Sequence, residues 1–320
     1  MFEKVIYKKF EGVVPMIAVI YYAYGAPKSI DDVEPYFSHI LNGKNVPAPM
    51  LENIVAMFKK PGFPDFIRSS TERIASGIEA TLNGALDEEV RVYPAYKHTE
   101  PFVADAYAQA VESGAKTVVT LAINPILSAT GGGAVHAEVE ELNKEHTIKH
   151  IVIDDYHLDE GIVSVYADRV RRAFNWLPVE AQKSSYVLFT VHSQPLDAER
   201  NAPYVKQFEE LAAAIAQKAG IERFQCVYRS GKKEGWLAPD VKDTMKSLYE
   251  NGAQGFVTCE LLSISADVES FIEINSECQE VATELNVDFA VSEFPGDSFD
   301  SVIALSNLIK KRVQAAVTVN

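Results

Sequence analysis

A row of glutamates in the last third of the chain has the residue type and spacing to hold a cation. Glu269, Glu273 and Glu277 stand four residues apart. On an α-helix, residues at this spacing share one face, with neighbouring Cβ atoms roughly 6 Å apart. Like charges so placed repel one another unless water screens them or a cation binds them. The alternative is an amphipathic helix with a solvated acidic side, and we assign Glu280 and Glu284 to such a side.

A second candidate is a histidine at the end of an apolar run. His192 follows Tyr186–Val191 and precedes Ser193 and Pro195. Imidazole can accept a proton near neutral pH, which suits a general base. A hydrogen-bonded structural histidine is the alternative. Glu269 has a structural alternative as well, because the dipole of a helix favours an anion in its first turn.

Other polar clusters carry weaker signals. Gly131–Gly133 is rich in glycine, but the chain has no GxGxxG or Walker sequence, so we do not expect a nucleotide site. Lys97 and His98 follow an apolar run, where a cation would suit a carboxylated substrate; a plain helix entry is the alternative. Trp236 is either a packing residue of a loop or an aromatic wall of a binding site.

Short apolar runs that alternate with helical patterns must position these side chains. Such alternation indicates parallel β-sheets that are covered by helices on both faces, so the sequence predicts an α/β protein. The predicted strands are Met16–Ala23, Val90–Tyr96, Thr117–Ile123, Ile151–Asp154, Tyr186–Val191, Phe224–Tyr228, Gly255–Leu261 and Phe289–Val291. The predicted helices are Ile30–Leu41, Met50–Phe58, Ser70–Leu82, Pro101–Glu112, Ala134–Lys144, Gly161–Phe174, Tyr204–Lys218, Pro239–Tyr249, Asp267–Leu285 and Asp300–Val313.

The predicted strands divide into two sets of four, which indicates two Rossmann-like domains. A polar stretch, Pro178–Ser185, precedes the second set. In each half a later strand runs into an irregular segment, Asn124–Gly133 in the first and Leu262–Ala266 in the second. Open parallel sheets bind ligands beyond the carboxyl ends of their strands. We therefore expect Tyr24, His192 and the start of the acidic helix to face one substrate cleft between the domains.

The bulk composition is that of a globular protein and excludes several classes. Of 320 residues, 47% are hydrophobic and 23% charged. The formal net charge of −15 argues against a nucleic-acid surface, which needs clustered Lys and Arg. Three cysteines without CxxC spacing fit a reducing cytosol. No stretch is apolar enough to span a membrane, and Met1–Phe10 lacks a signal-peptide pattern, so we expect a cytoplasmic protein without stable membrane insertion.

Six short segments also carry a resemblance to a known family over nearly the whole chain. They are Ala23–Pro27, Asp31–Gly43, Lys97–Phe102, Val191–Pro195, Trp236–Val241 and Ser265–Glu277. In this order they are similar to A-Y-G-T-P, a polar helix ending in H-I-x-x-G, K-H-I-E-P-F, A-H-S-L-P, W-L-G-P-D-V and S-D-H-x-E-T-L-Y-E-x-D-x-E. These are motifs of the ferrochelatases, the class II chelatases that insert Fe²⁺ into a porphyrin. The chain most resembles the short soluble type that acts on coproporphyrin III. Each motif is weak alone, but six in the right order at the right separations are specific.

The resemblance implies a role for each matching residue. His192 and Glu269 match the catalytic pair that flanks the porphyrin face at which the metal enters and the pyrrole protons leave. Glu273 and Glu277 match an acidic row thought to conduct metal or protons. The implied metal-binding residues are therefore His192, Glu269, Glu273 and Glu277, with a regulatory divalent cation near the last two. The implied substrate-binding residues are Tyr24, Lys97, His98, Ser193, Ser230, Trp236 and Lys44.

The chain departs from the family pattern near the proposed metal site. The family histidine two residues before the glutamate is Asp267 here, and the aspartate before it is Ala266. Of the usual Q-S pair only Ser230 remains, while Arg229 brings a new cation.

Two further departures concern the substrate carboxylates. The basic pair that helps to hold propionates in the family is replaced by Leu41 and Asn42. The G-G-I-S-P-L segment of the family is replaced by Pro61–Phe66. These changes put propionate recognition, and the identity of the substrate, in question.

The resulting prediction is a two-domain chelatase. Residues 1–155 form the N-terminal domain, residues 156–297 form the C-terminal domain with His192 and Glu269, and the helix at about 298–320 packs back on the first domain. The resemblance implies a monomeric lyase of haem biosynthesis that binds porphyrin and ferrous iron as substrates and needs no organic cofactor. The alternative, based on Asp267, Leu41 and Asn42, is a non-catalytic carrier or sensor of porphyrin or haem.

Overall fold

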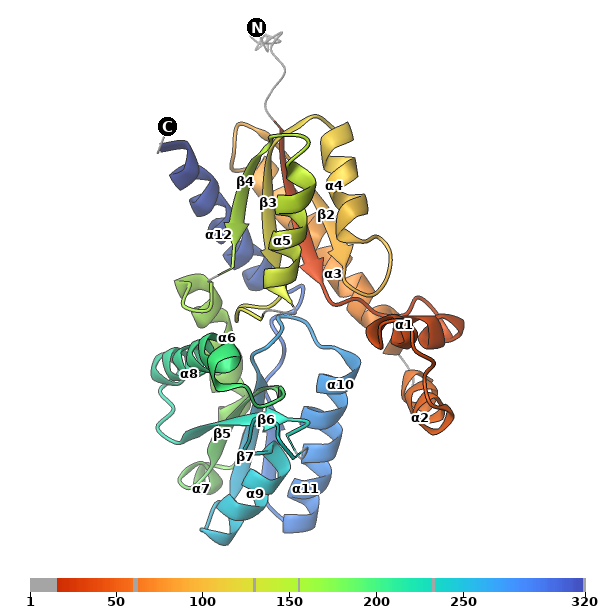
Figure 1. The fold of residues 1–320 in the computed structure, drawn as a ribbon. Helices are drawn as coiled ribbons and strands as arrows, with labels where there is room; N and C mark the ends of the chain where they lie inside the picture. Colours follow the sequence, from red (N-terminus) through yellow and green to blue (C-terminus); the bar gives the residue numbers. More distant parts are fainter. Residues whose placement is uncertain (1–15, 60–62, 129–130, 155, 232–233, 319–320) are drawn as a thin grey trace, which may run out of the picture.

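Two four-stranded parallel sheets form the framework of the protein. The computed structural model describes residues 16–59, 63–128, 131–154, 156–231 and 234–318. The first sheet has the order β2-β1-β3-β4 and consists of β1 (Met16–Ala23), β2 (Glu89–Tyr96), β3 (Ala115–Ala122) and β4 (Lys149–Ile153). The second has the order β6-β5-β7-β8 and consists of β5 (Tyr186–His192), β6 (Phe224–Arg229), β7 (Gly255–Glu260) and β8 (Asp288–Val291). In Figure 1 the first sheet lies above the second.

Helices connect the strands of both sheets. In the first half they are the 3₁₀ turn η1 (Ile30–Asp32), α1 (Val33–Ile40), α2 (Ala48–Phe58), α3 (Phe63–Asn83), α4 (Val103–Glu112) and α5 (Gly132–Asn143). In the second half they are α6 (Glu160–Trp176), α7 (Val179–Gln182), α8 (Ala198–Ala219), α9 (Val241–Glu250), α10 (Val268–Phe271), the π-helix η2 (Ile272–Glu277), α11 (Cys278–Leu285) and α12 (Phe299–Thr318).

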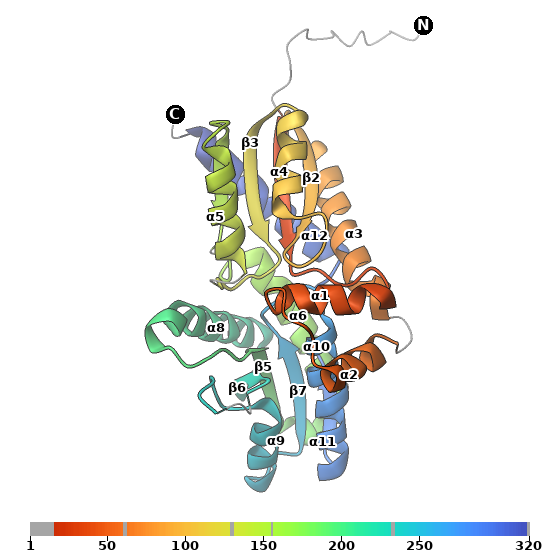
Figure 2. The same cartoon turned by 45° about the vertical axis from the view of Figure 1, so that its right-hand side comes forward.

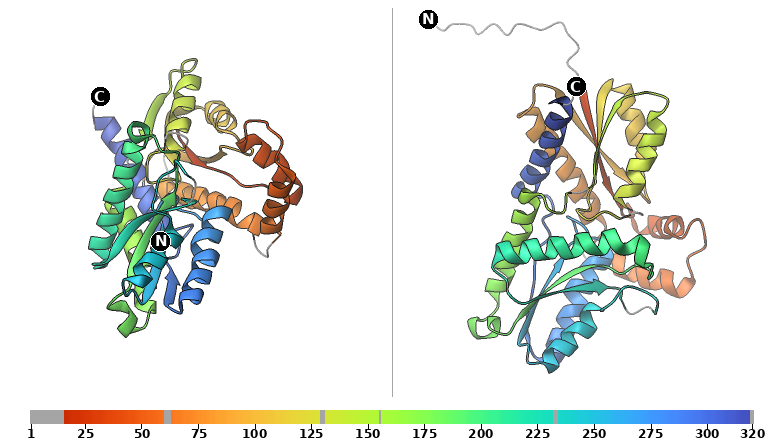
Figure 3. Two further views of the ribbon diagram at one scale, coloured as in Figure 1. Left: turned by 60° about the horizontal axis from the view of Figure 1, so that its bottom comes forward. Right: turned by 60° about the vertical axis from the view of Figure 1, so that its left-hand side comes forward.

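Each sheet is covered on both faces. Successive residues of a strand point to opposite faces. Even-numbered residues of β1, from Met16 to Tyr22, pack with α4 and α5, whereas odd-numbered ones, from Ile17 to Ala23, pack on the side of α3. Helices α6 and α8 cover one face of the second sheet, and α9 and α11 cover the other. Helix α12 packs against α3, β4 and α6, and Figure 3 shows it beside the first sheet. The predicted domain boundaries themselves stay a prediction.

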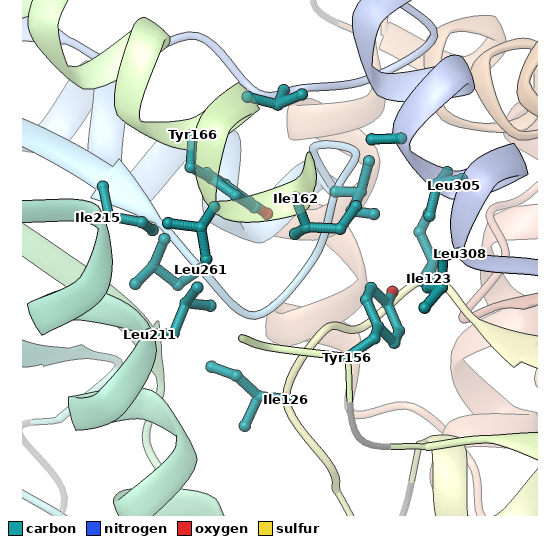
Figure 4. Close-up of a cluster of buried hydrophobic side chains, with 14 of the residues drawn as sticks. Ile123, Ile126, Tyr156, Ile162, Tyr166, Leu211, Ile215, Leu261, Leu305 and Leu308 are labelled. Carbon is teal, nitrogen blue, oxygen red and sulfur yellow. The ribbon is translucent and has the colours of Figure 1, made fainter. Parts of the chain in front are cut away.

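One apolar core runs through both halves of the molecule. Figure 4 shows its middle, where Tyr156, Ile162 and Tyr166 lie near Leu261 and Leu305. Burial of such large apolar side chains contributes roughly 1.5–3 kcal/mol each. The two buried tyrosines keep their hydroxyls satisfied: Tyr156 Oη donates to Ala122 O at 2.7 Å and Tyr166 Oη to Ser263 O at 3.3 Å.

The carboxyl ends of the two sheets face each other through the loops after β3 and β7. Asn124 Nδ2 donates to Leu262 O at 2.7 Å, and Ile264 N donates to Ile123 O at 3.2 Å. The two irregular segments singled out in the sequence are therefore in direct contact. Residues that follow strands in either sheet lie near this junction.

The structure confirms the predicted α/β class, with all eight strands and ten helical regions where the sequence placed them. Helices α3 and α8 begin more than one turn earlier than predicted, at Phe63 and Ala198. Asp197 Oδ1 caps α8 by accepting from Arg200 N. The stretch Pro178–Ser185 contains α7. Among the described residues, no helix is both long and apolar enough to cross a membrane.

The predicted single helix Asp267–Leu285 is wrong in its middle, which is the π-helix η2. The buried hydroxyl of Thr258, on β7, donates to Ile274 O at 3.0 Å. A side chain that bonds to a helix carbonyl competes with the helix's own ladder, and π-turns of this kind are frequent at functional sites. The acidic row thus lies partly on a widened turn.

Candidate active site

Three neighbouring strands of the second sheet end in ionisable residues. His192 ends β5, Arg229 ends β6 and Glu260 ends β7. His192 is in register with Arg229, and Thr190 with Glu260. Because the strands are parallel and adjacent, all three side chains are held at one edge of the sheet, where α/β sheets bind ligands.

His192 and Glu269 form an ion pair at this edge. His192 Nε2 lies 3.3 Å from Glu269 Oε2. Nδ1 donates to Ser193 O, so Nε2 is the nitrogen that gains or loses a proton. Burial favours the neutral ring, but the hydrogen bond and charge of Glu269, together with the hydrogen bond to Ser193 O, outweigh it and raise the pKa of His192. Burial acts against the charge on Glu269 too, yet its hydrogen bond to His192 and the charge of Arg229 lower its pKa to about 2.

Local sequence explains where Glu269 sits. Asp267 is the N-cap of α10, and its Oδ1 accepts from Ser270 N at 2.7 Å, while Ser270 Oγ accepts from Asp267 N at 3.1 Å. This reciprocal capping box fixes the start of the helix. Glu269 therefore occupies the first turn, where the helix dipole favours its charge. The side chain of Glu269 is 55% exposed and that of His192 28% exposed, so solvent reaches both.

Arg229 lies in the middle of the acidic residues and is only 2% exposed. Its guanidinium lies 3.3 Å from Glu260, 3.2 Å from Asp267, 3.3 Å from Glu269 and 3.6 Å from Glu273. Burial disfavours its charge, but the four carboxylates raise its pKa far above the ordinary value. Burial raises the pKa of Glu260, and Arg229 opposes that shift.

The next two carboxylates of the row have basic or hydroxyl partners. Glu273 Oε1 accepts from Ser230 N at 3.1 Å and from Ser230 Oγ at 2.8 Å, and burial raises the pKa of Glu273. Glu277 pairs with Lys242 Nζ. In the part of the chain that the structure describes, no three His, Cys, Asp or Glu side chains converge closely enough to hold a metal ion. The regulatory cation near Glu273 and Glu277 stays a prediction.

Tyr24 comes from the other sheet, directly after β1. The residue is 46% exposed, and its ring meets His98 edge-on at a centroid distance of 4.6 Å, with Lys97 Nζ 5.7 Å from its centroid. Burial, and then the charges of Glu269 and Asp267, raise the pKa of Tyr24 to about 12. Ala26, two residues after Tyr24, packs in one apolar cluster with Val268, the neighbour of Glu269. The structure therefore brings Tyr24 to the same junction as the His192 pair. Whether an open cleft separates them stays a prediction.

The other predicted substrate residues divide into two groups. Trp236 lies beside the site, with its ring centroid 6.3 Å from that of His192, and Pro195 pairs with it in a β-bridge. Ser193 is 1% exposed and its Oγ donates to Leu237 O at 2.7 Å, so this hydroxyl fixes the Trp236 loop. Ser230 donates from its backbone nitrogen and its hydroxyl to Glu273 of the acidic row. Lys44 is exposed on the loop between α1 and α2, and no contact described here links it to His192.

Comparison with known proteins identifies the family of the chain. The family model described as "Ferrochelatase" matches residues 16–313. The chain belongs to the ferrochelatase family. It is therefore a porphyrin metal chelatase, a lyase, by family. It is 27% identical to coproporphyrin III ferrochelatase 2 of Bacillus cereus over 307 residues, which cover 94% of this chain and 96% of the relative. It is 28% identical to the coproporphyrin III ferrochelatase of Geobacillus kaustophilus, over 91% of this chain and 94% of the relative.

A solved structure of a chelatase shares the fold. The cobalt complex of the sirohydrochlorin chelatase SirB from Bacillus subtilis subspecies spizizenii aligns with a TM-score of 0.58 at 12% identity, over 93% of this chain and 95% of that one. At this identity the likeness extends to the fold alone. It agrees with two Rossmann-like domains in this ferrochelatase-family member.

The departures from the ferrochelatase pattern have a structural setting. Leu41 packs against an apolar cluster of α1 and α2, while Asn42 is exposed with φ of 57°. Of the replaced segment Pro61–Phe66, the first two residues lie outside the described residues. The other four begin α3, and their side chains are not described. Asp267 and Arg229, which both depart from the family pattern, form an ion pair with each other. The new acid and the new base therefore compensate each other's charge.

Sequence reasoning missed three residues of this ferrochelatase-family site. Glu260 was treated as part of a strand, and Arg229 only as a departure from the pattern. A signal was present, because a charged residue that ends an otherwise apolar central strand needs a partner at the sheet edge. His39 was passed over as well: its Nδ1 lies 2.9 Å from His98 Nδ1, and its ring stacks on Phe102. No spacing in the sequence connects residues 39 and 98.

Proposed function

We propose that this protein inserts Fe²⁺ into coproporphyrin III as a step of haem biosynthesis, with His192 and Glu269 at the reacting face. The observation that carries the proposal is the 3.3 Å pair of His192 Nε2 and Glu269 Oε2, at matched family motifs on the edge where the sheet binds ligands. The family and the coproporphyrin III ferrochelatase relatives support the reaction class and the substrate.

The reaction needs a proton acceptor and a metal ligand. Two pyrrole N–H protons leave the porphyrin as the metal enters its plane. In the neutral ring Nε2 of His192 carries no hydrogen, because Nδ1 donates to Ser193 O, so this nitrogen beside Glu269 takes one proton. Glu269 is held ionised by His192 and Arg229, with its pKa lowered to about 2, so it presents a carboxylate oxygen to Fe²⁺ and does not take a proton near neutral pH. Imidazole and carboxylate are suitable ligands for Fe²⁺.

The second proton has a different acceptor in this proposal. Burial raises the pKa of Glu273, which makes it a better proton acceptor than Glu269. Glu273 lies next along the same row and shares Arg229 with Glu269. Protons therefore leave along the acidic row, toward Glu277.

The opposite side of the ring is proposed to meet Tyr24, with Trp236 at its edge. Lys97 and His98 lie beside Tyr24, and the cation of Lys97 suits a substrate propionate. Lys44, Ser193 and Ser230 remain proposed substrate contacts, although the hydroxyls of both serines have partners inside the fold. We propose a monomer in the cytoplasm, with porphyrin and ferrous iron as its partners.

The test is anaerobic metallation by the purified protein. Coproporphyrin III, protoporphyrin IX and sirohydrochlorin are each offered with Fe²⁺, and metallated product is counted per protein molecule. We expect many turnovers with coproporphyrin III and fewer with the other two. Preference for another ring would overturn the substrate. A porphyrin absorbance shift without turnover would mean that the protein is a carrier or sensor of porphyrin and not an enzyme.

A further inference from the structure

Arg229 contacts four carboxylates of the candidate site at once. Nε lies 3.3 Å from Glu260, Nη2 lies 3.2 Å from Asp267, and Nη1 lies 3.3 Å from Glu269 and 3.6 Å from Glu273. Its side chain is 3% exposed. A guanidinium is planar, keeps its charge at any physiological pH, and offers five N–H donors in a fixed fork. The group therefore fills the space among the four acids with a permanent cation.

The pairing with Glu260 holds the arginine in place. The Glu260 side chain is 0% exposed, and its Oε2 accepts from Thr190 Oγ1 at 2.6 Å. Arg229 and Glu260 end strands on either side of β5, which is paired with both. A buried charge without a partner is strongly destabilising, so these two residues depend on each other.

The same guanidinium limits what Glu269 can bind. Glu269 Oε2 lies 3.3 Å from Arg229 Nη1 and 3.3 Å from His192 Nε2. That oxygen is already shared by two nitrogen atoms, which leaves Oε1 for an incoming ligand. A second cation among Asp267, Glu269 and Glu273 would meet the charge of Arg229 at close range, where Coulomb repulsion is large.

We propose that Arg229 is a positioning residue that acts as a built-in cation: it takes the place of a resident divalent metal ion among Asp267, Glu269 and Glu273 and holds Glu269 against His192. The inference rests on the proposed function for the role of Glu269, but the occupancy of the site by arginine does not depend on turnover. Lys242 pairs with Glu277 in the same manner at the next position of the row. On this inference, Arg229 and Lys242 supply the positive charge near Glu273 and Glu277 for which the sequence predicted a regulatory cation.

The experiment measures binding of Mn²⁺ to the full-length, metal-free protein by electron paramagnetic resonance. Arg229→Gln alone would leave Glu260 uncompensated in the interior, so the main variant is Arg229→Gln/Glu260→Gln, which removes one buried charge of each sign. Three carboxylates then remain without the guanidinium. We expect this variant to bind one more Mn²⁺ than the parent, at least roughly tenfold more tightly than any parent site of this kind, because a repelling charge is gone.

Two further variants show whether charge is the cause. Arg229→Lys keeps the cation and should bind as the parent does. Adding Glu273→Gln to the double variant should abolish the gained Mn²⁺. Arg169→Gln/Asp300→Asn is the matched control, since it removes another buried arginine (6% exposed) and a 2.7 Å acidic partner away from the site; it should gain no Mn²⁺.

The outcomes are distinct. A folded double variant that gains no Mn²⁺ would overturn the inference, as would a parent protein whose own Mn²⁺ is lost on Glu273→Gln. A parent protein that fails to metallate any porphyrin would overturn the proposed function instead. The Mn²⁺ comparison would then still test whether Arg229 occupies the cation position.

Discussion

At the scale of single residues, His192 is the group on which the proposed chemistry depends most. Its Nε2 is the nitrogen free to accept a proton, because Nδ1 donates to Ser193 O. His192→Ala should lower the metallation rate by roughly 10²–10⁴-fold, the usual loss when a general base is removed. Porphyrin affinity should change little, because the ring is held elsewhere. Steady-state rates and fluorescence titration of porphyrin would measure the two effects. A rate within threefold of the parent would deny His192 a catalytic role.

The His192–Glu269 pair also predicts opposite pH trends for stability and rate. The pKa of His192 is raised above 6.5, so its stabilising charge is fully present below pH 6.5 and is lost as pH rises through the folded value. The pKa of Glu269 falls from 4.5 to about 2, so its contribution is present above pH 4.5 and is lost as pH falls toward 2. The rate needs neutral imidazole, so it should rise with pH above 6.5.

Glu269→Gln tests that assignment. It removes the hydrogen bond that raises the pKa of His192, so the pH at which the imidazole titrates should move down. Nuclear magnetic resonance of the His192 ring in parent and variant would follow the titration without requiring activity. An unchanged titration would mean that Glu269 does not control His192.

The positions of individual site residues were predictable where a motif carried them, while their roles stay predictions. His192, Glu269 and Tyr24 matched family positions, and the structure brings all three to one junction. Arg229 and Glu260 were not predictable as partners, because they lie on different strands and meet only through sheet order. The change from a family histidine to Asp267 made physical sense only once its 3.2 Å pair with Arg229 was visible.

At the scale of elements, the acidic helix is the part that sequence described least well. Four-residue spacing predicted a plain α-helix with one apolar side. Val268 and Cys278 are buried as such a side requires, but Phe271 is 43% exposed. In the π-helix, Ile274 O accepts a hydrogen bond from Thr258, which comes from a strand distant in sequence, so no local pattern announces it. The strands were easier, because an apolar run between two helical patterns in a parallel sheet has few other interpretations.

The row on this helix should influence metal more than porphyrin. Glu273→Gln removes a negative charge beside the site, so the apparent KM for Fe²⁺ should rise about severalfold through weaker electrostatic attraction. The KM for porphyrin should stay near that of the parent. Glu284→Gln, at an exposed carboxylate about three turns further on, is the control and should change neither constant. An equal apparent KM for Fe²⁺ in Glu273→Gln and Glu284→Gln would mean that the acidic row is an ordinary solvated surface.

At the scale of the whole molecule, the shared core links the stability of the two sheets. Leu261 is fully buried at the junction (Figure 4). Leu261→Ala should lower the free energy of unfolding by about 2–5 kcal/mol, the usual cost of a cavity in a core. Hydrogen exchange by mass spectrometry should report the loss in β1 and in β5 alike. Protection lost in β5 alone would mean that the halves unfold separately.

A control for this effect exists in a different cluster. Val46 is 7% exposed and packs with α1 and α2, apart from the shared core. Val46→Ala should loosen α1 and α2 while leaving the amides of β1 and β5 as protected as in the parent.

The separate packing of α1 and α2 determines which part of the protein can move when a flat macrocycle enters. A hinge motion between the two sheets would have to separate the side chains of the shared core. It would also break the hydrogen bonds from Asn124 to Leu262 and from Ile264 to Ile123. Helices α1 and α2, which lie beside the junction in Figure 2, touch the second half mainly through Val268 and Ile272. Small apolar contacts of this kind part at low cost. We therefore expect admission and release of the ring to be gated by an α1–α2 flap on a rigid body, with the turnover rate sensitive to that flap.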